Sequence, residues 1–160
     1  EVHSICGDST EGMVERLPKE LQQLAQDGIR PLFVLILGGT NDLGHMTPQE
    51  IFQNLTTMCH EVSKLPATPL LLTIPRDEFG LGPVARVVNR LLRREATERS
   101  WLFADVSTVS EEFLCDGVHF STAGYGHFAK LVLAAMQPRL SATVAMAKEV
   151  ADKGHSVRLD

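Results

Sequence analysis

The sequence predicts an α/β protein whose parallel sheet is covered by helices on both faces. Apolar runs of strand length alternate with longer segments of helical period, which is the pattern of strand–helix–strand units. The clearest run, Leu32–Leu37, is continuously apolar, as expected for a strand buried on both faces. With 160 residues, 44% of them hydrophobic, the chain is of single-domain size and can form one core.

Four segments are candidate strands. Leu32–Leu37 is stopped by Gly38 and Gly39, and Leu70–Ile74 ends at Pro75. Residues 101–106 form a shorter run of the same kind. Residues 2–5, at the start of the chain, are the fourth candidate.

Two helices between these strands have readable boundaries. Thr47, Pro48 and Glu50 supply an N-cap, a first-turn proline and a capping-box glutamate, so a helix is expected from there to about Lys64. Residues 83–99 carry apolar residues on one face and arginines on the other, which predicts an amphipathic surface helix with a solvated arginine face.

Two further helical segments are less regular. Apolar residues recur over 13–24, but Pro18 interrupts them and predicts two short helices. The tail from Ser141 to about Gly154 is expected to be a separate helix capped by Ser141. We therefore expect a domain over residues 1–140 and a C-terminal helical extension over 141–160.

The bulk composition limits the partners. The net charge is -5 and the basic residues are scattered among acids, so no nucleic-acid surface is expected. No apolar run approaches 18 residues and no leader pattern is visible, so neither a membrane span nor a signal peptide is predicted. Cys6, Cys59 and Cys115 are an odd number at wide spacing, which argues against a disulfide framework or a zinc site and mildly favours the cytoplasm. The oligomeric state stays open.

The strongest candidate for chemistry is Asp116-Gly117-Val118-His119. A carboxylate three residues before a histidine, in a glycine-containing turn, can accept the Nδ1 proton and stabilise the imidazolium that forms when Nε2 takes a proton. The alternative is a helix N-terminal acid beside an exposed histidine.

Asn41 is the second candidate, because it follows the buried strand through Gly38, Gly39 and Thr40. Its side-chain amide could donate to an oxyanion at the carboxyl edge of the sheet, where ligands of open α/β sheets bind. The alternative is a turn asparagine without a chemical role. Asp42 is expected to cap or brace the loop.

Taken together, Gly39-Thr40-Asn41-Asp42 and Asp116-Gly117-Val118-His119 resemble blocks III and V of the SGNH (GDSL-type) hydrolases, over residues 1 to about 137. The resemblance implies a flavodoxin-like three-layer α/β/α fold with a parallel sheet, and makes residues 1–140 an SGNH hydrolase domain. It also implies a catalytic histidine at His119, an orienting aspartate at Asp116 and an oxyanion-hole amide at Asn41.

Gly7-Asp8-Ser9 spells the family's best-known motif, but Ser9 lies only 32 residues before Asn41, too close for the family's block I. The segment from Ser4 to Leu21 instead resembles block II, which makes Gly7 the oxyanion-hole glycine. The nucleophile is then unknown, and the family's first strand is expected to be missing. Ser9 stays an alternative nucleophile.

A second G-x-S match, at Ser156, lacks the preceding strand that a nucleophile elbow needs. Residues 156–159 are the only internal segment that could replace the missing strand.

The resemblance implies a serine-dependent hydrolase of carboxylic esters or thioesters, of the esterase or lipase type, acting on a small-molecule ester or acyl substrate. No cofactor and no metal is implied. The rival interpretation is a catalytically inactive SGNH-like module that keeps the cleft for binding. An acyltransferase or sugar-ester deacetylase is a third possibility within the family.

Overall fold

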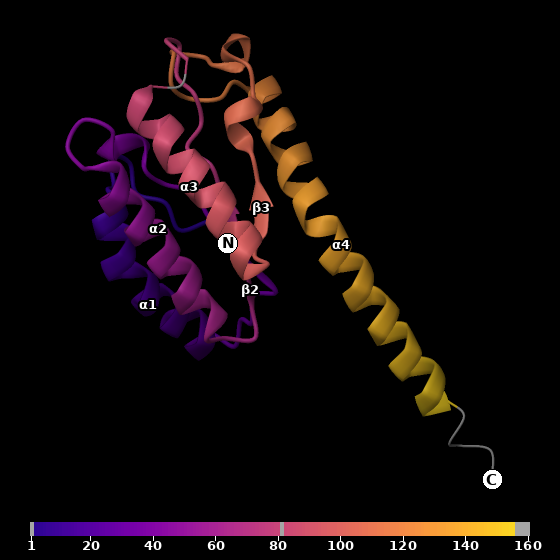
Figure 1. Cartoon of the computed structure of the whole chain (residues 1–160). Helices are drawn as coiled ribbons and strands as arrows, with labels where there is room; N and C mark the ends of the chain where they lie inside the picture. Colours follow the sequence, from indigo (N-terminus) through magenta and orange to yellow (C-terminus); the bar gives the residue numbers. More distant parts are fainter. Residues whose placement is uncertain (1, 81, 156–160) are drawn as a thin grey trace.

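The protein folds as a three-layer α/β/α arrangement, shown by a computed structural model (Figure 1) that describes residues 2–80 and 82–155, with side chains through residue 146. This confirms the predicted fold class. The helices are α1 (Thr10–Gln26), α2 (Pro48–Ser63), α3 (Pro83–Arg99) and α4 (Thr122–His155), and the strands are β1 (Phe33–Ile36), β2 (Thr68–Leu72) and β3 (Leu102–Ala104). Three short 3-10 turns lie in the loops, at Thr40–Asp42, Val106–Thr108 and Glu111–Phe113.

The sheet is parallel, with the strand order β1-β2-β3. Leu70 of the central strand pairs with Leu35 of β1 and with Leu102 of β3. Leu70, Leu71 and Leu72 have no exposed surface, as expected for a strand with a neighbour on each side and helices on each face.

Helices α1, α2 and α3 cover one face of the sheet, and α4 covers part of the other (Figure 1). The α1–α3 face holds the larger core, which includes Ile51 and Leu55 of α2 and Val88 and Leu92 of α3. On the opposite face, Leu70 packs with Val132 and other apolar residues of α4. The C-terminal half of α4 extends beyond the body of the molecule in Figure 1.

Local signals set the bounds of two helices. The Thr47–Glu50 capping box is present, because the hydroxyl oxygen of Thr47 accepts from the Glu50 N–H at 3.3 Å while the Glu50 carboxylate accepts from the Thr47 N–H at 2.8 Å. The hydrogen bonds that the Glu50 carboxylate accepts from the Thr47 N–H and the Thr47 hydroxyl lower the pKa of Glu50. α3 spans the predicted residues 83–99, with Pro83 in its first turn.

The predicted strand over residues 2–5 is wrong. The segment is not in the sheet, and Val2 and Ile5 are 88% and 56% exposed. It lies instead along α1, where Arg16 donates to the His3 carbonyl at 3.1 Å. A strand exists only through backbone pairing with a neighbour, and the described residues provide no partner strand for this segment.

In the described part of the chain β1 is an edge strand, and one of its faces is uncovered. Leu35 lies on the α4 side of the sheet, as its partner Leu70 does, yet Leu35 is 44% exposed because α4 packs over β3. Leu32 and Leu37, at either end of β1, are also exposed.

The two short helices predicted around Pro18 are one continuous helix, α1. A proline inside a helix removes one backbone hydrogen bond. Met13, Val14, Leu17 and Leu21 pack against the core from both sides of the proline, and this burial offsets the lost bond.

The separate helix predicted from Ser141 is also wrong, because α4 runs without a break from Thr122 through Pro138 to His155. Ser141 therefore does not cap a helix. The division into a domain over 1–140 and an extension over 141–160 stays a prediction. Ser156 and the candidate strand 156–159 lie outside the described residues.

Candidate active site

The predicted site residues lie on loops at one end of the molecule. Residues 38–42 follow β1, residues 73–80 follow β2, and residues 105–121 lie between β3 and α4. Because all three strands are parallel, these loops meet at the carboxyl edge of the sheet, at the upper end of Figure 1.

Asp116 and His119 form a hydrogen-bonded pair. The Nδ1 atom of His119 lies 2.7 Å from Oδ2 of Asp116. The other carboxylate oxygen accepts from the backbone N–H groups of Val118 at 3.1 Å and His119 at 2.8 Å. Gly117, with φ +85°, allows the chain to turn between them. The pair is therefore organised by the four residues of its own turn.

This geometry suits the histidine for proton transfer. An ionised carboxylate can only accept, so Nδ1 carries the proton, and in the neutral imidazole Nε2 then has a free lone pair. The backbone N–H of His119, its side chain and the Val118 N–H together lower the pKa of Asp116 to about 2. Asp116 stays ionised at neutral pH. The His119 side chain is 69% exposed, so its Nε2 edge is accessible.

Asn41 and the Gly7 turn are brought together although 34 residues separate them in the chain. The Asn41 Nδ2 atom donates to the Asp8 carbonyl at 2.8 Å. Gly7 adopts φ +76°, which favours glycine, while a Cβ there would meet nothing within 4 Å. The predicted oxyanion-hole residues thus share one corner of the carboxyl edge.

Asp42 braces this corner. Its side chain is buried, and its two oxygens accept from the Thr10 N–H at 3.2 and 3.1 Å. Thr10 begins α1, so the carboxylate satisfies an otherwise unpaired N–H of that helix and lies at the positive end of its dipole. The expectation that Asp42 braces the loop is confirmed.

Ser9 has a structural role in this arrangement. It is the N-cap of α1, and its Oγ accepts from the Gly12 N–H at 3.2 Å. Within the described residues, no hydrogen bond joins Ser9, or any other serine or cysteine side chain, to His119. The hydroxyl of Ser9 is thus engaged at the helix end, and its use as the nucleophile stays a prediction without a supporting contact.

The loop after β3 is anchored by Asp105. Its carboxylate accepts from Thr73 at 3.1 Å, from Ser107 at 2.6 Å and from Arg93. Burial alone would raise the pKa of Asp105, but hydrogen bonds from Ser107, Arg93 and Thr73 outweigh it and lower this pKa. The network ties the end of β2 to the start of the loop that leads to His119.

The loop after β2 is held in two further ways that the sequence analysis missed. Asn89 of α3 is buried, and its side chain accepts from the Ile74 N–H and donates to the Ile74 carbonyl, both at 2.8 Å. Farther along the loop, the Glu78 N–H donates to the Gly117 carbonyl at 2.7 Å. Asn89 stands among apolar residues of an amphipathic helix, and that position was the only available sequence signal.

The two halves of the predicted site, Asp116 with His119 and Gly7 with Asn41, make no hydrogen bond to one another in the described part of the chain.

Among the described residues, no group of three or more histidine, cysteine or acidic side chains could hold a metal ion. The three cysteines are free, and burial raises the pKa of the Cys59 thiol to about 12. No helix in this part of the chain has the length and apolar character that a membrane crossing requires.

Comparison with known protein families shows to which family the chain belongs. The model of the GDSL-like Lipase/Acylhydrolase family matches residues 1–127. The chain belongs to this family. No curated protein matches its sequence. Membership of the GDSL family makes the chain an esterase- or lipase-type hydrolase by family, consistent with the polar carboxyl edge described above.

Solved structures support the GDSL fold. A GDSL-like lipase from Bacteroides thetaiotaomicron VPI-5482 is 18% identical with a TM-score of 0.73, covering 86% of this chain and 75% of that one. The protein TesA is 27% identical with a TM-score of 0.64, covering 82% and 74%. The acetylxylan esterase Axe2 from Geobacillus stearothermophilus is 23% identical with a TM-score of 0.64, covering 81% and 68%.

Proposed function

We propose that the site cleaves a carboxylic ester or thioester through a Ser-His-Asp triad. His119 accepts a proton at Nε2 from the attacking serine hydroxyl, and Asp116 stabilises the imidazolium. The Gly7 backbone N–H and the Asn41 amide stabilise the oxyanion. The observation that carries the proposal is the 2.7 Å contact between His119 Nδ1 and Asp116, which leaves Nε2 free on an exposed edge of a GDSL-family fold.

The proposed steps are those of a Ser-His-Asp triad. Attack of the serine oxygen on the carbonyl carbon forms a tetrahedral intermediate while Nε2 takes the hydroxyl proton. The imidazolium then returns this proton to the departing alcohol or thiol, leaving an acyl-enzyme. Water hydrolyses the acyl-enzyme by the same proton route and releases the acid. Every proton that moves passes through His119, and the reaction needs neither a metal nor an organic cofactor.

A direct test is hydrolysis of p-nitrophenyl acetate by the chain and by His119→Ala. We expect the substitution to lower kcat/KM by about 10²–10⁴, the usual contribution of a general base. Exposed imidazoles attack this ester without an active site, so the control is His45→Ala, which removes another exposed loop histidine. Equal rates for the chain and His119→Ala would refute the assignment.

The second candidate function is a binding module that no longer hydrolyses esters. It is favoured by one observation: among the described residues no serine or cysteine side chain is hydrogen-bonded to the His119 side chain. A fluorophosphonate probe separates the two functions, because it labels only an activated nucleophile. Labelling supports the hydrolase and identifies the serine by mass spectrometry, whereas an unlabelled chain without esterase activity supports the binding module.

A further inference from the structure

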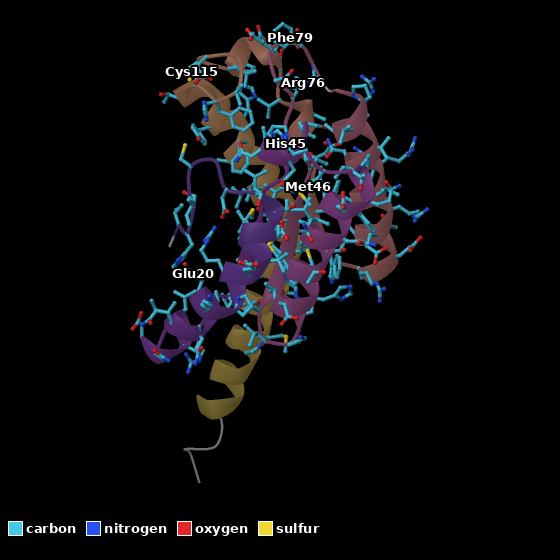
Figure 2. All side chains as sticks on the ribbon, turned by 90° about the vertical axis from the view of Figure 1, so that its left-hand side faces the viewer. Glu20, His45, Met46, Arg76, Phe79 and Cys115 are labelled. Atoms are coloured by element: carbon cyan, nitrogen blue, oxygen red, sulfur yellow. The ribbon has the colours of Figure 1, made fainter. Side chains whose placement is uncertain are left out.

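The loop after β2 presents an aromatic ring to solvent beside the His119 loop. Phe79 is 90% exposed, more than any other large hydrophobic residue in the described part of the chain. Figure 2 shows Phe79 at the upper end of the molecule, above both Arg76 and Cys115. Single exposed apolar residues are common on protein surfaces, so the exposure of Phe79 alone does not indicate a binding site.

The turn that carries Phe79 has a defined backbone. Asp77 and Gly80 exchange two backbone hydrogen bonds, of 3.2 and 3.0 Å. The Phe79 N–H donates to the Asp77 carboxylate at 2.9 Å, and Gly80 has φ +88°. These contacts fix where the Phe79 side chain leaves the backbone.

The same turn is bonded to the loop that carries the Asp116–His119 pair. The Glu78 N–H donates to the Gly117 carbonyl at 2.7 Å. The Glu78 side chain lies over Gly117 so closely that a Cβ there would be 2.6 Å from the carboxyl carbon. Phe79 follows Glu78 in the chain, and Val118 follows Gly117, so this hydrogen bond links the backbones that carry both side chains. Val118 is 45% exposed. The position of the ring is therefore coupled to the turn that orients His119.

The charges around the turn limit what can lie against the ring. Asp77, Glu78 and Asp116 supply carboxylates, while Arg76 pairs with Glu111 at 3.4 Å. A phosphate or other anion is disfavoured beside these carboxylates, whereas an uncharged hydrocarbon chain gains by covering the ring.

From these contacts we infer that Phe79, together with Val118, binds the apolar acyl chain of the substrate. This inference rests on the proposed ester hydrolysis and deepens it by assigning the substrate class, esters with an uncharged acyl chain beyond acetyl. Phe79 is a specificity-determining residue, because the ring contacts the chain and leaves the proton transfer at His119 unchanged.

The inference is tested by binding, independently of turnover. Neutral 2-butanone, 2-hexanone and 2-octanone carry a carbonyl with alkyl chains of increasing length, and their binding is followed through the amide NMR signals of residues 117–119. We expect the Kd to fall with length, by up to about fourfold for each methylene that becomes fully buried. Phe79→Ala removes part of one aromatic contact and should raise the Kd of 2-octanone about tenfold. The same substitution should raise the Kd of 2-butanone less than twofold.

Two variants serve as controls. Phe79→Leu keeps an apolar side chain and should retain most of the length dependence. Leu133→Ala shortens an exposed apolar residue of α4 and should bind all three ketones as the unaltered chain does. Equal Kd values of 2-octanone for the unaltered chain and Phe79→Ala overturn the inference, as does a lack of length dependence in the unaltered chain.

The experiments distinguish a failure of the acyl-chain contact from a failure of the proposed ester hydrolysis. If p-nitrophenyl acetate is hydrolysed through His119 while Phe79→Ala leaves ketone binding unchanged, the hydrolase stands and the acyl-chain contact is wrong. If the ketones bind through Phe79 but no ester is cleaved, the apolar contact stands and the hydrolase is wrong.

Discussion

Asp42 offers the sharpest test of how the site is supported. It is adjacent in sequence to Asn41, yet the two side chains have opposite environments. Asp42 is 1% exposed and accepts from the Thr10 N–H, whereas Asn41 is exposed and donates to the Asp8 carbonyl. Replacing each residue by alanine should therefore separate stability from activity.

The magnitude for Asp42→Ala follows from its contacts. The change leaves the buried Thr10 N–H without its acceptor, which typically costs about 1–3 kcal/mol. It also removes a carboxylate from the N-terminus of α1, a favourable contact of up to about 2 kcal/mol in partly buried sites. The two effects overlap, and removing a buried charge offsets part of them. We expect the free energy of unfolding to fall by about 2 kcal/mol.

Urea unfolding measures this loss as a lower midpoint at an unchanged m-value. Asn41→Ala removes one exposed hydrogen bond and should lower the free energy of unfolding by at most about 1 kcal/mol. Under the proposed function, Asn41→Ala should instead lower the esterase rate by about 10²–10³. An Asp42→Ala protein that loses less than about 0.5 kcal/mol would refute the bracing role derived from the Thr10 contact.

Two further predictions concern the loops around His119. The pKa of Asp116, measured by NMR titration of its carboxyl carbon, should be about 2. Because the folded-state pKa of Asp116 lies below its unfolded-state value of 3.8, the stabilisation from these hydrogen bonds is fully present above pH 3.8 and is lost as the pH falls toward about 2. An NMR titration midpoint near 3.8 would contradict the hydrogen bonds to Asp116. Asn89→Ala should lower the free energy of unfolding by about 2–4 kcal/mol, since both backbone groups of Ile74 lose their partner. A loss below about 1 kcal/mol in urea unfolding would show that water replaces the side chain.

Elements with local signals were predicted well. α3 spans the predicted residues, and the Thr47–Glu50 capping box begins α2, because caps and helical periodicity act within one or two turns. The continuous apolar run at 32–37 likewise predicted β1. The Asp116–His119 hydrogen bond follows equally from local geometry, although its catalytic role stays a prediction.

The errors occurred where distant contacts override local preference. Pro18 argues for a break in α1, but core packing on both sides of the proline keeps the helix continuous. Val2 and Ile5 have strand-like side chains and no partner strand among the described residues, so the segment stays outside the sheet. Ser141 can cap a helix, yet it lies within α4.

The sequence by itself determined the α/β class, the bounds of α3, and the turn that joins Asp116 to His119, because each depends on residues close together in the chain. Only the tertiary structure decided which loops meet. It placed Asn41 against Asp8, Asp42 against Thr10 and Glu78 against Gly117, across separations of 32 to 39 residues. Such pairings arise from burial and from the need of each buried polar group for a partner, and neither leaves a periodic pattern in the sequence.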